Sequence, residues 1–232
     1  MNKKKSIKRT FISIIFFVLT ICSYGQNDNR FPVWTFHKKN VNIHGISVGL
    51  WTGAISERNT NTNGIRLELI GVGIGIPLIP SAPTLEDFGE QRSEIINGLS
   101  LSTFGTDCNC LTNGLSVGGI AQINYQVNGM VLSCMVNFTL KQNGIMIASI
   151  NYSNSMNGLQ LALGRNYSSE ANGVQITLIT NEAEKMRGLQ IGVVNKSKDL
   201  RGIQIGLWNI NQKRKLPLLN WNFKRTTENE AD

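Results

Sequence analysis

Hydrophobic and polar residues alternate around a glycine that recurs about every 15 residues along most of the chain. Ten copies of the tetrad Gly-apolar-x-apolar begin at Gly45, Gly64, Gly98, Gly114, Gly129, Gly144, Gly158, Gly173, Gly188 and Gly202. The residues one and three positions after each glycine are apolar in all ten copies, and the residue between them is usually polar. This period of two predicts one short, half-buried β-strand in each repeat.

The two apolar columns are predicted to face the interior of the protein. In the last two copies, GLQIGVVN and GIQIGLWN, this phase buries Ile191 and Ile205 and exposes Gln190 and Gln204. The sixth position after the glycine is also apolar in nine of the ten copies and fails only at Gly164. Positions one, three and six cannot share one face of a flat strand, so a recurring bend or bulge is predicted in every repeat.

Polar stretches separate these strands and are expected to be connections, as at residues 181–185 and 196–199. Asn precedes seven of the repeat glycines, which predicts a tight turn with left-handed backbone at each Asn-Gly pair. One interval, from Gly64 to Gly98, is longer than the others, and an irregular loop is predicted there over residues 77–96. No helix of consequence is predicted after the first 25 residues.

Two folds accommodate such an array. In a β-solenoid of about ten repeats of 14–19 residues, each repeat is one coil, and stacking places identical columns in contact. The alternative is an antiparallel up-and-down β-meander or barrel with one strand per repeat. The connections do not alternate between long and short, and the aromatic content of 7% is thin for two interfacial girdles. The predicted fold class is therefore all-β and solenoid-like.

A targeting segment precedes the repeats. Residues 2–9 are strongly basic, residues 11–22 form an apolar run, and small residues stand at the first and third positions before a cleavage at Gln26. This layout is typical of a secretory signal peptide over residues 1–25. A run of twelve apolar residues is too short to span a membrane. Cys22 lacks the small preceding residue that lipid attachment requires.

Removal of the signal peptide changes the charge of the protein. The full chain carries 23 basic and 15 acidic residues, a net charge of +8, and five of the basic residues lie in the leader. The remaining +3 does not indicate a nucleic-acid partner. The mature chain is interpreted as an N-terminal cap or linker over 26–41, one β-repeat domain over 42–223 and a disordered polar tail over 224–232.

The three cysteines of the mature chain are interpreted as small buried or half-buried thiols. Export permits disulfides, but three is an odd number. A single residue separates Cys108 from Cys110, so a bridge between them is expected to be strained. Cys134 stands apart, and no Cys-x-x-Cys pair exists for redox or zinc chemistry.

Other candidate chemistry is sparse. The glycines of residues 71–75 lack a following helix and a Lys-Ser/Thr pair, so they are not interpreted as a phosphate loop. His37 and His44 lack metal-ligand spacing. The acidic residues at 86–90 are interpreted as part of a solvated loop rather than a glycosidase carboxylate pair. The sequence therefore predicts no catalytic, cofactor-binding or metal-binding residue and no enzyme.

The repeat unit G-[LIV]-Q-I-G-[LV]-x-N resembles that of a poorly characterised group of bacterial secreted or surface repeat proteins. The closing segment LPLLNWNF at 216–223 resembles their terminal segment, and the leader ending in Gly-Gln resembles those of Bacteroidota exports. The resemblance implies an exported or surface-exposed protein and no chemistry.

The function expected from these observations is that of an exported, non-enzymatic structural or interaction protein of the adhesion type. It is expected in the periplasm, at the outer membrane or cell surface, or outside the cell. Its expected partners are cell-surface or envelope components, with no nucleic acid. The alternative is an outer-membrane β-barrel that serves as a pore or scaffold, so peripheral and integral outer-membrane association are both left open.

Overall fold

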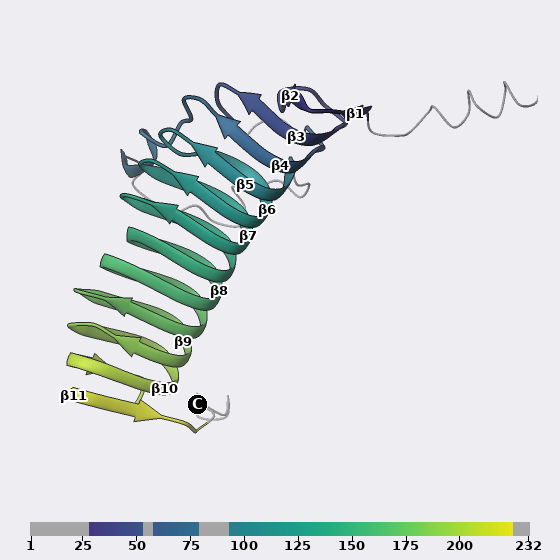
Figure 1. The fold of residues 1–232 in the computed structure, drawn as a ribbon. Helices are drawn as coiled ribbons and strands as arrows, with labels where there is room; N and C mark the ends of the chain where they lie inside the picture. Colours follow the sequence, from purple (N-terminus) through teal and green to yellow (C-terminus); the bar gives the residue numbers. More distant parts are fainter. Residues whose placement is uncertain (1–27, 53–57, 79–92, 225–232) are drawn as a thin grey trace, which may run out of the picture.

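The computed structural model shows a β-solenoid in which the chain winds through about 11 turns (Figure 1). The structure describes three stretches of chain: residues 28–52, 58–78 and 93–224. The predicted signal peptide, the acidic residues at 86–90 and all but the first residue of the predicted tail lie outside these stretches. The two ends of the described chain lie at opposite ends of the rod (Figure 1).

Strands make up nearly all of the described chain. In order, the elements are β1 (Asp28–Arg30), β2 (Val33–Thr35), β3 (Val41–Gly49), β4 (Thr60–Glu68), the 3₁₀ helix η1 (Ile76–Leu78), β5 (Glu94–Ser102), β6 (Asp107–Gly118), β7 (Ala121–Ser133), β8 (Val136–Thr177), β9 (Thr180–Ile191), β10 (Val194–Ile210) and β11 (Lys215–Asn222). Strand β8 alone contains 42 residues, because the chain passes through several coils without a break in pairing.

Neighbouring strands run parallel along the solenoid. Strand β1 pairs with β3, and the order then continues from β3 through β10 in sequence, with each strand beside the next. Among the described strands, only β11 departs from this pattern, since it pairs antiparallel with β10 and closes the C-terminal end. The solenoid predicted from the repeats is confirmed, and the antiparallel alternative is wrong for the described residues.

The repeat glycines stack directly on one another. Gly173 pairs with Gly188, which pairs with Gly202, and the same register joins the earlier copies. Gly173 has a φ of +135°, and a Cβ there would lie 2.0 Å from the carbonyl oxygen of Gly158 in the preceding turn. The positive φ predicted at the Asn-Gly pairs is confirmed. The chain nevertheless continues through each glycine as extended strand, so the separate tight turn predicted there is not formed.

Each coil contains a second strand that sequence reasoning assigned to a connection. Residues 181–185 lie within β9 and residues 196–199 within β10, where they pair in register. The expectation of polar connections was wrong because the outward side chains form ion pairs between turns, such as Lys196 to Glu182 at 3.1 Å. The predicted bend is confirmed: strand structure breaks four to six residues after several repeat glycines, as at residues 119–120 and 134–135.

The predicted inward and outward faces are reversed. Gln190 and Gln204 are completely buried, whereas Ile205 is 43% exposed and Ile191 is only partly buried. Inside the coil, each glutamine amide donates to the carbonyl oxygen of the glutamine one turn before it. These Nε2–Oε1 distances are 2.8 Å for Gln175 to Gln160, 2.7 Å for Gln190 to Gln175 and 2.8 Å for Gln204 to Gln190. Identical amides at the strand spacing satisfy one another, so the glutamine column tolerates burial.

A second amide ladder joins the two strands of each coil from within. It consists of buried asparagines whose Nδ2 atoms donate to the next Oδ1 over 2.8–3.2 Å: Asn137, Asn151, Asn166, Asn181, Asn195 and Asn209. The first five also donate to the backbone carbonyl ten residues further on, at 2.7–2.9 Å. Apolar burial is local, as in the cluster of Met156, Ala171, Ala183, Met186 and Leu200.

The reversed faces predict an unusual order of mutational sensitivity. Gln190→Leu deprives Gln175 Oε1 of its donor and one N–H of Gln204 of its acceptor, so we expect a loss of about 2–3 kcal/mol in the free energy of unfolding. Ile205→Gln changes a side chain that is 43% exposed, and we expect a loss below about 1 kcal/mol. Denaturant unfolding of both variants measures this order, and a larger loss for Ile205→Gln would contradict the assignment of faces.

Candidate functional site

The reversal of the two faces leaves the apolar columns on the outside of the rod. We call the outward side chains one, three, five and six positions after the repeat glycines the apolar face. Twelve of its members are at least 42% exposed: Leu50, Trp51, Leu69, Ile70, Met135, Leu163, Leu178, Ile179, Val193, Ile205, Leu207 and Trp208. The face points outward because the residue two positions after each glycine is buried inside the coil. In the last four repeats this inward residue is Gln, and it builds the glutamine ladder.

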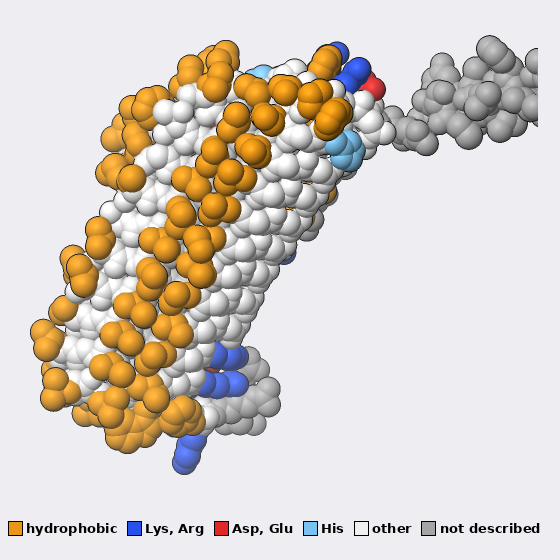
Figure 2. All heavy atoms as spheres, in the orientation of Figure 1, with side chains coloured by type: hydrophobic (Ala, Val, Ile, Leu, Met, Phe, Trp, Pro, Cys, Tyr) orange, Lys and Arg blue, Asp and Glu red, His pale blue; other side chains and the backbone are white. Residues whose placement is uncertain are grey.

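The apolar face runs along the whole described rod. Figure 2 shows its side chains as long bands that continue from the N-terminal turns to the C-terminal strand. None of the ten repeats places a charged residue at the four positions that define the face. Soluble monomers seldom expose a continuous apolar surface of this extent, and a surface of this kind marks a site of contact.

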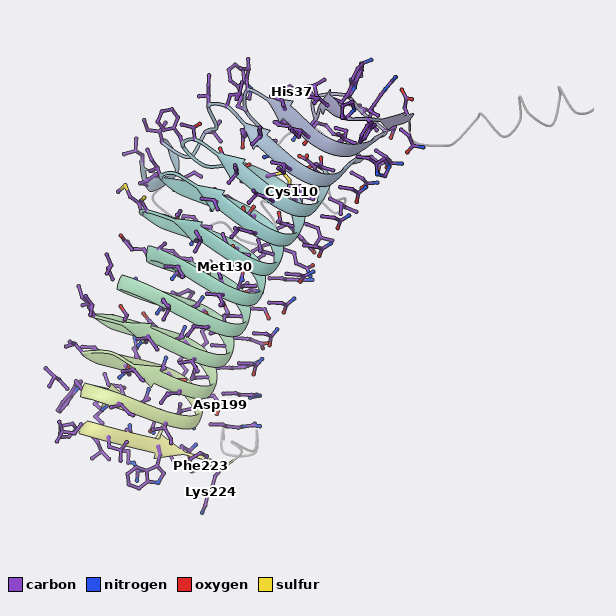
Figure 3. All side chains as sticks on the ribbon, in the orientation of Figure 1. His37, Cys110, Met130, Asp199, Phe223 and Lys224 are labelled. Carbon is purple, nitrogen blue, oxygen red and sulfur yellow. A yellow bond between two sulfur atoms is a disulfide. The ribbon has the colours of Figure 1, made fainter. Side chains whose placement is uncertain are left out.

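An uncharged ladder borders one long edge of the apolar face. The asparagines that precede the repeat glycines donate Nδ2 to the preceding Oδ1 over 2.8–3.1 Å, through Asn63, Asn97, Asn113, Asn128, Asn143, Asn157 and Asn172. Stacked side chains along this edge are visible in Figure 3. Arg187 and Arg201 occupy the same position in the last two repeats. The border is therefore neutral over seven turns and basic only near the C-terminal end.

Charged side chains gather instead on the other strand of the C-terminal coils. Lys185 Nζ lies 2.8 Å from Glu170 Oε1, and Lys198 Nζ lies 2.6 Å from Glu184 Oε1. The hydrogen bond from Lys185 lowers the pKa of the Glu170 carboxyl. These exposed pairs add little stability, but they make this side of the coil hydrophilic. The cross-section of the rod is therefore amphipathic.

The first turns enclose a buried ion-pair network that sequence reasoning missed. Arg66 is completely buried, its Nε lies 3.1 Å from both carboxylate oxygens of Glu94, and its Nη1 lies 3.3 Å from Glu68 Oε2. Its guanidinium carbon lies 4.2 Å from the centroid of the Phe36 ring. Burial raises the pKa of Glu94, and the charges of Arg66 and Arg58 oppose that rise. The positive charges of Arg58 and Arg66 are balanced by the negative charges of Glu68 and Glu94 within the coil, which suits a structural role.

The disulfide between Cys108 and Cys110 corrects the interpretation of these residues as thiols. Both cysteines are buried, and their Cα atoms lie 5.0 Å apart, within the span of ordinary disulfides. The expectation of free thiols was based only on the single residue that separates the two cysteines. In the structure, the pairing of β6 with β7 shifts in register between residues 108 and 111, which changes the local geometry. Cys134 is a free thiol, as expected, but it is exposed rather than buried.

Within the described residues, one cluster of metal-ligand types includes the two cysteines of this disulfide. The ligand atoms of Glu94, Cys108 and Cys110 all lie within 4.8 Å of one another. The two sulfur atoms are bonded to each other instead of being thiolates, and Arg66 already binds the carboxylate of Glu94. Metal ligation by cysteine requires the thiolate, so the oxidised cluster does not offer a metal site.

Among the residues that the structure describes, the two histidines and the glycines at 71–75 form no site. His37 is exposed, and its Nε2 accepts a hydrogen bond from the backbone N–H of Leu50 at 3.2 Å. His44 is also exposed, one residue before a repeat glycine. Within residues 71–75, Gly73 packs so closely that a Cβ would lie 2.0 Å from the carbonyl oxygen of Phe104. This packing accounts for that glycine without a phosphate.

No known protein family, curated protein or solved structure matches the chain. Within the part of the chain that the structure describes, no helix has the length and apolar character needed to cross a membrane. The candidate site is therefore identified from the structure alone. The apolar face is a long surface that the described turns leave open to contact.

The buried network predicts strong sensitivity at one carboxylate. Glu94→Gln removes the charge that faces Arg66 and Arg58 inside the coil, so we expect a loss of about 3–5 kcal/mol in the free energy of unfolding. Glu170→Gln breaks an exposed pair and serves as the control, with no measurable change expected. Denaturant unfolding compares the two variants. Equal stability of both variants would contradict a structural role for the network.

Proposed function

We propose that the protein is an exported, non-enzymatic structural or interaction protein that makes its contacts through the apolar face. The observation that carries the proposal is the uncharged row of exposed aliphatic and aromatic side chains along the rod. Exposure of apolar side chains to water is unfavourable in free energy, so burial of this face against a partner is favourable. Its working place is the periplasm, the outer membrane or cell surface, or the exterior of the cell.

The construction of the rod supports this role. Hydrogen bonds between identical side chains run from turn to turn inside the coil, and they hold successive repeats at a fixed spacing. A stack of this kind presents the same contact at regular intervals, which is how repeat proteins build long binding surfaces. The partners expected for such a surface are components of the cell envelope.

The export of the protein is supported by the sequence of its first 25 residues. Their basic, apolar and small-residue regions follow the order of a secretory signal peptide. The buried disulfide between Cys108 and Cys110 is compatible with an oxidising compartment outside the cytoplasm.

Export and contact are tested together by producing the full chain in a bacterium that has an outer membrane. We expect the protein outside the cytoplasm, with an intact mass that corresponds to a chain starting at Gln26. On native gels of the non-cytoplasmic extract, we expect it to migrate as a complex larger than one chain. Full-length protein in the cytoplasm would contradict export, and migration of the wild type as a single chain would contradict the proposed contact role.

Two triple variants control this experiment. The variant Leu163→Gln, Leu178→Gln and Leu207→Gln removes three of the most exposed members of the apolar face, and we expect it to be exported and folded but to migrate as one chain. The variant Glu170→Gln, Glu184→Gln and Lys185→Gln changes the charged side and should keep the complex. If only the charged-side variant lost the complex, the contact would lie on the charged side of the coil. That result would contradict the proposed role of the apolar face.

A further inference from the structure

We propose that the occupant of the apolar face is a second copy of this chain, which packs its own apolar face against the first. This inference rests on the proposed function, because it identifies the partner of the same surface. Three properties of the face favour a second copy: its area, its period and its charge.

The area of the face matches that of a stable protein interface. Ten repeats at the strand spacing of about 4.8 Å give a face about 50 Å long. The five steps along the chain from position one to position six, at about 3.3 Å each, give a width of about 17 Å. The product is about 850 Å² for each copy, and a standard interface buries about 800 Å² on each partner. One face covered by one copy therefore suffices for specific association.

The period of the face is matched by a second copy. Each column places one apolar side chain per turn, as Leu189 and Ile203 do beside each other in register. A second solenoid has the same spacing between turns, so its side chains can enter the gaps between those of the first along the full length. Two sheets packed in this way lie about 10 Å apart, as in a β-sandwich.

The charges around the face permit a copy to approach. The four positions of the face carry no charge, and the asparagine border is neutral over seven turns. Only Arg187 and Arg201 are charged along that border. A twofold axis along the rod places these arginines beside the bend edge of the partner, and a twofold axis across the rod places them at its opposite end. In neither symmetric arrangement do these two arginines meet their own counterparts.

The test uses the mature protein recovered after export. Light scattering coupled to size-exclusion chromatography should give twice the mass of one chain for the Cys134→Ser form, which cannot dimerise through that thiol. The triple variant Leu163→Gln, Leu178→Gln and Leu207→Gln in the same background should give the mass of one chain and should still unfold cooperatively, at a midpoint lowered only by the loss of the partner. A dimer that persists in the triple variant would overturn the proposal, because the contact would then lie elsewhere.

Cys134 supplies a second, position-specific measurement. It lies five residues after Gly129, on the apolar face, and its thiol is exposed in the single chain. A second copy on this face would cover it, so we expect a maleimide to label Cys134 several-fold more slowly in wild-type protein than in the triple variant. Equal labelling rates at a concentration where light scattering shows dimers would place the contact elsewhere and overturn the proposal.

The remaining outcomes separate this proposal from the proposed function. A purified wild type that is monomeric overturns the second copy as partner. If that monomer sediments with phosphatidylethanolamine–phosphatidylglycerol vesicles and the triple variant does not, the apolar face binds lipid and the proposed function stands. If wild type and triple variant are both monomeric, fail to bind vesicles and migrate as single chains in extracts, both proposals fail.

Discussion

Parallel, in-register stacking at the glycine column is the constraint on which the rest of this protein depends. At Gly188, a Cβ would lie 2.0 Å from the carbonyl oxygen of Gly173, so no side chain fits between the turns at this corner. The close approach holds every coil in the same register as the one before it. Each residue therefore lies next to its own counterpart from the neighbouring repeat. A property repeated in sequence thus becomes a continuous row in space.

This register decides which residues occupy the interior. An isolated buried glutamine would leave polar atoms without partners, but a column of glutamines supplies each amide with a donor and an acceptor of its own kind. Gln175, Gln190 and Gln204 fill the interior in this way, while the aliphatic residues on either side of them point to solvent. The polar interior and the apolar exterior therefore have one cause. The surface proposed for contact is a consequence of how the coil is held together.

The repeats, the strand that follows each repeat glycine and the solenoid could be predicted from the sequence, because period and alternation do not depend on which face is buried. The parallel strand order was left open, and the second strand of each coil was predicted wrongly as a connection. The face itself was predicted wrongly at Gln190 and Ile205, since the usual preference for apolar interiors was applied to a fold that satisfies polar columns internally. The signal that was available is uniformity: the residue two positions after the glycine is Gln in all four final repeats, whereas the apolar columns vary. Arg66 stands in the same column, two positions after Gly64. Because that column is buried, the presence of an arginine there indicates an internal ion pair, which Arg66 forms with the distant carboxylate of Glu94. The disulfide between Cys108 and Cys110 could not be predicted from their sequence spacing, because it depends on the local strand register.

Hydrogen exchange of the glutamine side-chain amides, followed by NMR, tests the central claim most directly. The interior ladder predicts that the Nε2 protons of Gln175, Gln190 and Gln204 exchange with solvent far more slowly than those of a glutamine in an unstructured peptide. Assignment of these side chains in the native mature protein makes the comparison specific to each turn. Slow exchange at all three positions is the result expected from amides buried between neighbouring turns. Exchange at the rate of the unstructured peptide would show that the glutamine column faces water, and it would contradict both the polar interior and the apolar face.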